Sequence, residues 1–146
     1  MGATGAARIV QIHPTRKCNL SCLHCYSQSS PRERGALEID LLCEAVSAAA
    51  AEGYNTVSLS GGEPLLYAPL RELLQHARGC GMRTTVTTNG MLLTARNIER
   101  LRDTVDVLAL SIDGVPASHN RMRGNALAFD AMQSRLAAVR AAGLNF

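Results

Sequence analysis

Three cysteines stand close together in the segment CNLSCLHC, at positions 18, 22 and 25. Thiolates are soft ligands that suit zinc ions and iron–sulfur clusters. A structural zinc site needs four ligands, and His24 could supply the fourth, but its place beside Cys25 makes joint tetrahedral ligation awkward. A fully ligated [4Fe–4S] cluster also takes four cysteines, so three would leave one iron open to a substrate or cofactor. The spacing therefore predicts a metal or cluster site in this loop.

The compartment expected for the chain favours metal binding by these thiols over disulfide formation. The chain has 146 residues and a net charge of +3, and no apolar run approaches the length of a membrane span. The N-terminal MGATGAAR lacks the apolar core of a signal peptide, and Ala6 breaks the myristoylation pattern. We therefore expect a cytoplasmic protein with reduced thiols. Lys and Arg are scattered, which predicts neither nucleic-acid nor membrane binding.

Outside the loop, the remaining cysteines and histidines stand alone. Cys43 lies in a predicted helix, and Cys80 sits between two glycines at a predicted helix end. Such single cysteines are more often small buried side chains than ligands. His13, His76 and His119 are likewise expected to take no part in catalysis. The cysteine loop is therefore the one segment in which the cysteines predict chemistry.

The elements that must position the loop alternate between strand and helix. Extended apolar runs predict strands at 8–13, 56–60, 82–88 and 105–112. Helical spacing of apolar residues predicts helices at 38–52, 69–78, 94–102 and 126–142. Pro69 suits a first helical position, Thr94 suits an N-cap, and residues 144–146 resemble the opening of a fifth strand. This alternation implies an α/β fold with a parallel sheet, in a barrel or an open doubly wound arrangement.

Three successive predicted strands carry small or polar residues on one face near their carboxyl ends. These residues are Ser58 and Ser60, then Thr85, Thr87 and Asn89, and then Ala109, Ser111 and Asp113. A strand covered by helices on both faces should be apolar on both. We therefore expect the polar face to line a cofactor cavity at the carboxyl edge of the sheet, where α/β proteins bind ligands. Alternatively, serine and threonine simply fill strand positions.

These motifs carry a resemblance to a known family. CNLSCLHC fits the C-x3-C-x2-C signature of the radical S-adenosylmethionine (radical SAM) enzymes, and SGGEP at 60–64 resembles their GGE motif. TTNG at 87–90, SIDG at 111–114 and RMRG at 121–124 follow in the family's order. The resemblance implies a partial (βα)6 radical SAM barrel. Because the chain holds four βα units and a fragment, we expect an incomplete core domain over 1–146, truncated at about strand five.

The resemblance also implies what fills the open iron. Cys18, Cys22 and Cys25 would hold a [4Fe–4S] cluster, and the amine and carboxylate of S-adenosylmethionine would chelate the fourth iron. An electron from the reduced cluster would cleave S-adenosylmethionine, and the 5'-deoxyadenosyl radical would abstract hydrogen from the substrate. On this interpretation, the ligand missing from the loop is the cosubstrate.

Further residues are implied around that cosubstrate. Gly61 and Gly62 would let the backbone approach the methionine moiety, and Glu63 would accept from its ammonium group. Arg123, in preference to Arg121, would pair with the carboxylate. The other implied cofactor-binding residues are Ser111 and Asp113 at ribose-contacting positions, Thr88 and Asn89 on the same rim, and His24 and Tyr26 flanking the loop. The ring of His24 would lie near the adenine.

The reaction itself is less sharply indicated. CNLSCLHCY, GGEP and SIDG look most like the branch with C-terminal SPASM domains, which implies peptide modification first. Cofactor synthesis of the haem or molybdopterin type comes second. The substrate would be a peptide or a small molecule, and a reductant such as flavodoxin or ferredoxin would supply the electron. From the residues alone, an iron–sulfur carrier or scaffold without radical chemistry and a zinc-binding structural module also remain open.

Overall fold

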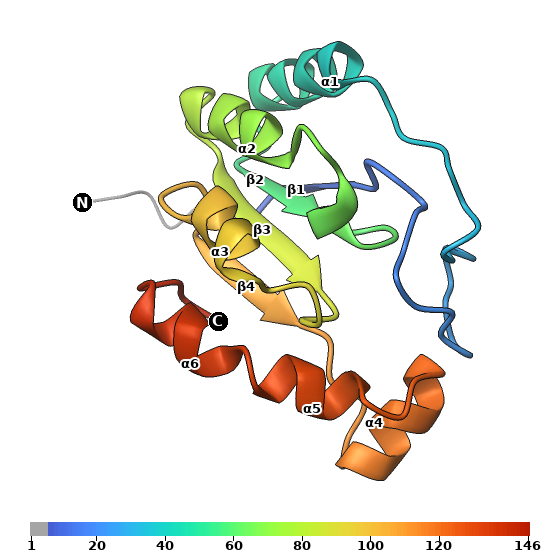
Figure 1. Cartoon of the computed structure of the whole chain (residues 1–146). Coiled ribbons are helices and arrows are strands. Elements are labelled where there is room, and N and C mark those ends of the chain that lie inside the picture. The colour runs from blue at the N-terminus through green and yellow to red at the C-terminus, as the bar shows by residue number, and fades with distance from the viewer. Residues whose placement is uncertain (1–5) are drawn as a thin grey trace.

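The computed structural model describes residues 6–146, which form a four-stranded parallel sheet with accompanying helices (Figure 1). The strands, in chain and spatial order, are β1 (Ile9–Ile12), β2 (Thr56–Leu59), β3 (Arg83–Thr88) and β4 (Val107–Leu110). The helices are α1 (Ile39–Ala51), a short 3-10 helix η1 (Pro64–Leu66), α2 (Leu70–Gly79), α3 (Ala95–Leu101), α4 (Pro116–Arg123), α5 (Ala128–Gln133) and α6 (Leu136–Ala141). The predicted α/β fold of parallel strands alternating with helices is confirmed.

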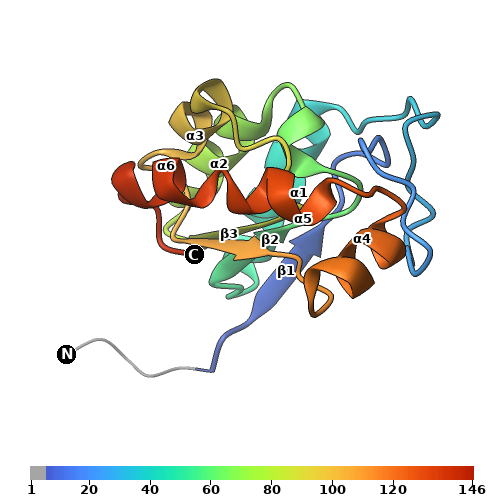
Figure 2. The ribbon, with the colours of Figure 1, turned by 60° about the horizontal axis from the view of Figure 1, so that its bottom comes forward.

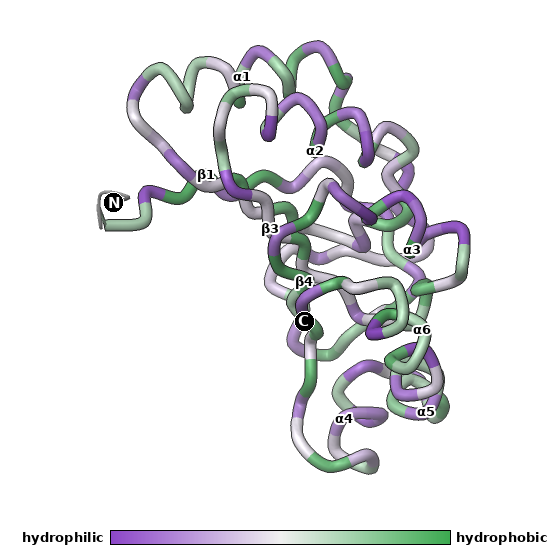
Figure 3. Tube along the Cα trace, turned by 90° about the vertical axis from the view of Figure 1, so that its left-hand side faces the viewer, coloured by the Kyte–Doolittle hydropathy of each residue, from purple (hydrophilic) through white to green (hydrophobic). Residues whose placement is uncertain are grey.

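One face of the sheet carries the core. The register aligns Ile12, Leu59, Val86 and Leu108 in a row across all four strands, and all four side chains are buried. Figure 2 shows α1, α2 and α3 on this side of the sheet. In Figure 3 the strands carry hydrophobic stretches, whereas hydrophilic residues recur along α2 and α3. The apolar side chains of the strands are therefore covered by amphipathic helices, and the polar residues of these helices face solvent.

The opposite face of the sheet is polar. The neighbouring row in the register joins Gln11, Ser58, Thr85 and Val107, of which Gln11 is exposed and the others are half-buried. The one-sided alternation predicted for these strands is confirmed. Its physical reason is that the helices gather on the apolar side, so that the polar side is not covered by a second helical layer (Figure 2).

The helices differ from expectation in three places. The single helix predicted over 126–142 is two helices, α5 and α6, which separate where Ser134 Oγ donates to the carbonyl of Ala131 at 2.8 Å. Such bonding of serine to a preceding carbonyl often bends helices. Pro69 is the N-cap residue of α2 rather than its first helical residue. The sequence predicted no helix at α4, whose one buried residue is His119, so no apolar periodicity marked it.

The sequence also predicted features for the two ends of the chain, a fifth strand at the C-terminus and the lack of a signal peptide at the N-terminus. Residues 144–146 form no strand, but the carbonyl of Asn145 accepts from the amide of Leu108 at 2.8 Å. The segment thus lies along the outer edge of β4, where a fifth strand would pair. Residues 1–5, part of the stretch judged for a signal peptide, lie outside the described residues. Among residues 6–146, no helix is both long and apolar enough to cross a membrane.

Asp106, just before β4, ties this strand to β3. Its carboxylate accepts from the amide and the hydroxyl of Thr84, at 2.8 and 3.2 Å, and from Arg78 Nη1 at 2.9 Å. Burial alone would raise the pKa of Asp106, but these donors outweigh it, so the pKa lies below its usual value.

Replacing Asp106 by Asn should lower the free energy of unfolding by about 1–2 kcal/mol at pH 7, because a charged acceptor of three hydrogen bonds is lost. A depressed folded-state pKa stabilises the fold above the unfolded value of about 3.9, and this stabilisation is lost as the pH falls through the folded-state pKa. Urea unfolding at neutral and acidic pH measures the difference, which should shrink in acid. Asp103→Asn is the control, since Asp103 is exposed and has a left-handed φ of 59° that Asn also tolerates. A pH-independent difference would contradict the assigned role.

Candidate functional site

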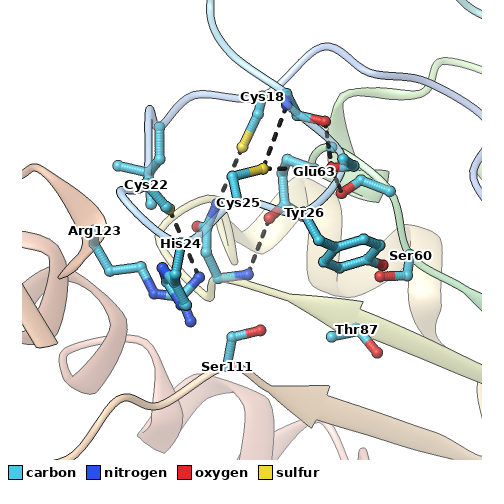
Figure 4. Close-up of a pocket in the computed structure, with 16 residues that line it drawn as sticks. Cys18, Cys22, His24, Cys25, Tyr26, Ser60, Glu63, Thr87, Ser111 and Arg123 are labelled. Carbon is cyan, nitrogen blue, oxygen red and sulfur yellow. Dashed lines mark hydrogen bonds between the residues drawn. The ribbon is translucent and has the colours of Figure 1, made fainter.

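A pocket of about 280 Å³ lies at the carboxyl edge of the sheet (Figure 4). The segment 13–30, here called the cysteine loop, contributes Cys18, Leu20, Cys22, His24, Cys25, Tyr26, Ser27 and Ser29. The segment after β2 contributes Ser60, Gly61, Gly62 and Glu63, and the rest of the wall is Thr87, Asn89, Ser111 and Arg123. The prediction that the polar strand faces end in a cavity is confirmed. The structure also gathers most of the predicted site residues around this cavity.

Backbone hydrogen bonds hold the cysteine loop against the segment after β2. Past the paired strands, the amide of Gly62 donates to the carbonyl of Thr15, and the amide of Glu63 donates to that of Lys17, both at 2.9 Å. A Cβ on Gly62 would overlap the Lys17 carbonyl oxygen, and Gly61 has a φ of +103°. The glycines were expected to admit the cosubstrate. The structure adds that they admit the backbone of the cysteine loop itself.

The three thiols lie in unequal surroundings. Burial raises the pKa of Cys18 to about 11. Burial also raises the pKa of Cys22, although the Arg123 guanidinium opposes the shift. Burial acts in the same direction on Cys25, but hydrogen bonds from Ser27 and from the amide of Ser29, which lies 3.3 Å from Sγ, lower its net pKa. The pocket thus favours the thiolate form of Cys25 over that of Cys18.

The arrangement of the thiols can be compared with what a metal centre requires. Within residues 6–146, no three His, Cys, Asp or Glu side chains converge closely enough to share one metal ion. All three cysteines of the loop nevertheless line a single pocket. In a [4Fe–4S] cluster each thiolate binds a different iron, so the sulfurs surround a volume instead of converging on a point. The donor set, three thiols around one pocket, fits an iron–sulfur cluster with one open iron.

Glu63 places a buried carboxylate in the pocket wall. Its Oε1 accepts from Thr88 Oγ1 at 2.8 Å and from the backbone amide of Leu65 at 3.2 Å. Its Oε2 accepts from the backbone amide of Asn89 at 3.0 Å. Burial raises the pKa of Glu63, and these donors oppose that shift. All three partners are donors, which suits the ionised form. Thr88 does not line the pocket, because its hydroxyl is turned to Glu63 behind the wall.

Asn89 connects the end of β3 to the cysteine loop. Its side-chain amide donates to Asn19 Oδ1 at 2.9 Å and lies 4.0 Å from Cys18 Sγ. Its side-chain oxygen accepts from the amide of Met91 at 3.0 Å, which fixes the orientation of the side chain. The expected position of Asn89 on the rim of the sheet therefore brings it beside the first cysteine.

Arg123, at the end of α4, reaches the pocket from the opposite wall (Figure 4). Its Nε donates to Asp113 Oδ2 at 2.6 Å, and its Nη1 lies 3.8 Å from Cys22 Sγ. Asp113 Oδ1 lies 3.2 Å from His24 Nε2. The amide of Asp113 donates to Nδ1 of His119, a fully buried imidazole whose pKa is lowered by burial. Asp113 itself does not line the pocket.

Of the remaining residues considered in the sequence, some line the pocket and others lie away from it. The ring of Tyr26 is largely exposed, and its hydroxyl lies 3.1 Å from His13 Nε2. Arg121 is exposed and does not line the pocket. Cys43 and Cys80 are half-buried against the apolar core and away from the pocket, as expected of small apolar side chains. Ser27 and Ser29 were not predicted as partners of Cys25, and their only signal in the sequence is the polar run that follows the third cysteine.

Residues 12–146 match the Radical SAM superfamily, and the chain belongs to this superfamily of enzymes. It is 35% identical to the Fe-coproporphyrin III synthase of Methanosarcina barkeri (strain Fusaro / DSM 804), over 84% of this chain and 31% of that protein. It is also 35% identical to the AdoMet-dependent heme synthase of the same strain, over 98% of this chain and 42% of that protein. The chain thus spans less than half the length of these curated relatives.

Two solved structures show the same fold over most of the chain. Streptococcus suis SuiB bound to S-adenosylmethionine matches with a TM-score of 0.77 and 23% identity, over 94% of this chain and 32% of that one. Native anSMEcpe with bound AdoMet matches with a TM-score of 0.75 and 22% identity, over 94% of this chain and 42% of that one. The fold is therefore a partial radical SAM core, as predicted.

Gly62→Ala should lower the free energy of unfolding by about 1–3 kcal/mol, because the added Cβ forces the cysteine loop away from the segment after β2. Gly35→Ala is the matched control, since a Cβ there meets no atom within 4 Å. Urea unfolding of the two variants and the unsubstituted protein measures the difference. If both substitutions have the same small effect, the backbone contact at Gly62 is not the constraint described above.

Proposed function

We propose that this chain forms the N-terminal part of a radical SAM enzyme whose Cys18, Cys22 and Cys25 hold a [4Fe–4S] cluster, with S-adenosylmethionine at the fourth iron. The observation that carries the proposal is the set of groups around one pocket. Three thiols share it with the Glu63 carboxylate and the Arg123 guanidinium. The methionine moiety of S-adenosylmethionine has an ammonium and a carboxylate, which these two side chains complement in charge.

The bound cluster would supply the electron that breaks a carbon–sulfur bond of S-adenosylmethionine. The residues of the chain would bind and orient that molecule. Arg123 would pair with its carboxylate, and Glu63 would accept from its ammonium group. The remaining proposed contacts are the backbone of Gly61 and Gly62, the side chains of Asn89 and Ser111, and the rings of His24 and Tyr26. Thr88 and Asp113 lie behind this layer and would act through their neighbours.

For the reaction we propose a step in the synthesis of an iron porphyrin, with a tetrapyrrole precursor as the substrate. The two relatives at 35% identity are named for coproporphyrin and heme synthesis. The peptide-modifying alternative rests on relatives of lower identity. Among them are the antilisterial bacteriocin subtilosin biosynthesis protein AlbA of Bacillus subtilis (strain 168), at 29%, and a structure of SuiB bound to the precursor peptide SuiA, at 22%. Sequence identity therefore favours the second of the two reaction types predicted from the motifs. A flavodoxin or ferredoxin in a reducing cytoplasm would supply the electron.

Anaerobic reconstitution of the full chain should load about four irons, and reduction with dithionite in the presence of S-adenosylmethionine should release 5'-deoxyadenosine. Cys22→Ala should lose both the cluster and this product. Cys43→Ala is the matched control, because it removes a cysteine outside the pocket, and it should retain both. Stoichiometric zinc without iron would refute the cluster. A full iron complement without cleavage of S-adenosylmethionine would leave an iron–sulfur carrier instead of a radical enzyme.

The substrate class can be tested with the reconstituted protein. Iron coproporphyrin, tried as the precursor of a heme-type product, should be consumed only when S-adenosylmethionine and reductant are both present, as followed by chromatography with mass detection. Hydrogen abstraction by the 5'-deoxyadenosyl radical should move deuterium from a labelled macrocycle side chain into 5'-deoxyadenosine. If the porphyrin is untouched while a precursor peptide encoded beside the gene is modified, the peptide alternative is correct.

A further inference from the structure

Asp113 was expected to contact the ribose of the cosubstrate, but it stands outside the pocket lining, and its carboxylate contacts two residues of that lining. Oδ2 accepts from Arg123 Nε at 2.6 Å, and Oδ1 lies 3.2 Å from His24 Nε2. The side chain is 21% exposed, and it does not line the pocket. Both partners, in contrast, do line the pocket. Asp113 therefore stands behind the pocket wall and touches two residues of it at once.

The pairing with Asp113 leaves Arg123 equipped for a second anion. Arginine has five N–H groups, of which one on Nε is used by Asp113 and one on Nη1 faces Cys22 Sγ at 3.8 Å. The other three have no hydrogen-bond partner within residues 6–146. The side chain is 11% exposed and lines the pocket. Asp113 thus fixes a nearly buried guanidinium by one edge while its other edge stays available to a carboxylate.

Asp113 also connects two segments that are distant in the sequence. His24 belongs to the cysteine loop, and Arg123 ends α4. A backbone bond from the amide of Leu23 to the carbonyl of Met122, at 2.9 Å, joins the same two segments. Asp113 itself is anchored by its amide, which donates to the buried His119 at 3.2 Å. The carboxylate is therefore held from its own backbone and can impose an orientation on both partners.

We propose that Asp113 is a positioning residue that sets Arg123 to receive the carboxylate of the methionine moiety and sets the ring of His24, and that it does not contact the ribose. The inference rests on the proposed function, since it assumes S-adenosylmethionine in the pocket. It assigns Asp113 to recognition of an amino-acid carboxylate. A residue that positions Arg123 and a residue that contacts the ribose would affect different ligands when substituted, so the two roles can be separated by experiment.

Free L-methionine separates the two roles, because it has the amine and carboxylate but no ribose. In the full chain loaded with its cluster, Asp113→Ala should weaken binding of S-adenosylmethionine and of methionine by a similar factor, about tenfold or more. Asp113→Asn keeps an acceptor for Arg123 and should restore part of the loss for both ligands. Each ligand is titrated against the electron paramagnetic resonance spectrum of the reduced cluster, so the readout does not depend on turnover. Asp130→Ala, the removal of an exposed carboxylate on α5, is the matched control and should change neither affinity.

Several outcomes would overturn the proposal. Weaker binding of S-adenosylmethionine with unchanged binding of methionine would restore the ribose contact. Unchanged binding of both ligands would also contradict it, because Arg123 would then need no orientation by Asp113. Tighter binding of methionine would contradict it too, because removing the negative charge of Asp113 would then matter more than orienting Arg123. If Asp113→Ala does not retain its cluster, the comparison of the two ligands in Asp113→Asn decides. If neither ligand perturbs the cluster of the unsubstituted protein, the proposed function itself fails, a result distinct from a failure of the Asp113 variants alone.

Discussion

The pocket depends on the close approach of two backbones, that of the cysteine loop and that of the segment after β2. The amides of Gly62 and Glu63 extend the pairing of β1 with β2 beyond the ends of the strands, by donating to the carbonyls of Thr15 and Lys17. A Cβ at position 62 would overlap the Lys17 carbonyl oxygen, so any residue larger than glycine must displace the backbone there. The cysteine loop has little regular structure of its own, so these bonds determine where Cys18 lies relative to the sheet. The same approach turns the Glu63 carboxylate inward, where it is buried.

Each charged group in the pocket wall is held by a polar residue behind it. Thr88 donates to Glu63, and Asp113 accepts from Arg123. A buried charge is costly unless hydrogen bonds compensate it, and a long side chain gains precision when one edge is already engaged. Neither supporting residue lines the pocket, although both come from the strand ends that sequence motifs mark. Membership of a motif therefore does not by itself separate residues that face a ligand from residues that orient them.

Most of the fold and the cysteine site could be predicted because their signals are local in the sequence. The cysteine spacing, the glycine pair and the small polar residues of the strands are each visible within a few residues, and the structure brings them together at one edge of the sheet. What could not be predicted depends on the path of a loop or on contacts between distant segments. The pairing of Ser29 with Cys25 follows from the path of the loop, and the need for glycine at 62 comes from a carbonyl 45 positions earlier in the chain.

The helix α4 shows why hydrophobic pattern alone is an incomplete guide near a polar site. It has no apolar stripe, yet Pro116 at its start and Gly124, with a φ of 64° at its end, define both termini. Its one buried side chain, His119, packs edge-on against Phe129 of α5, with ring centroids 5.6 Å apart. The helix is thus stabilised by its termini, by α5 and by the cysteine loop rather than by the main core. Because the bond from Leu23 to Met122 ties α4 to that loop, the position of Arg123 and the path of the cysteines are determined together.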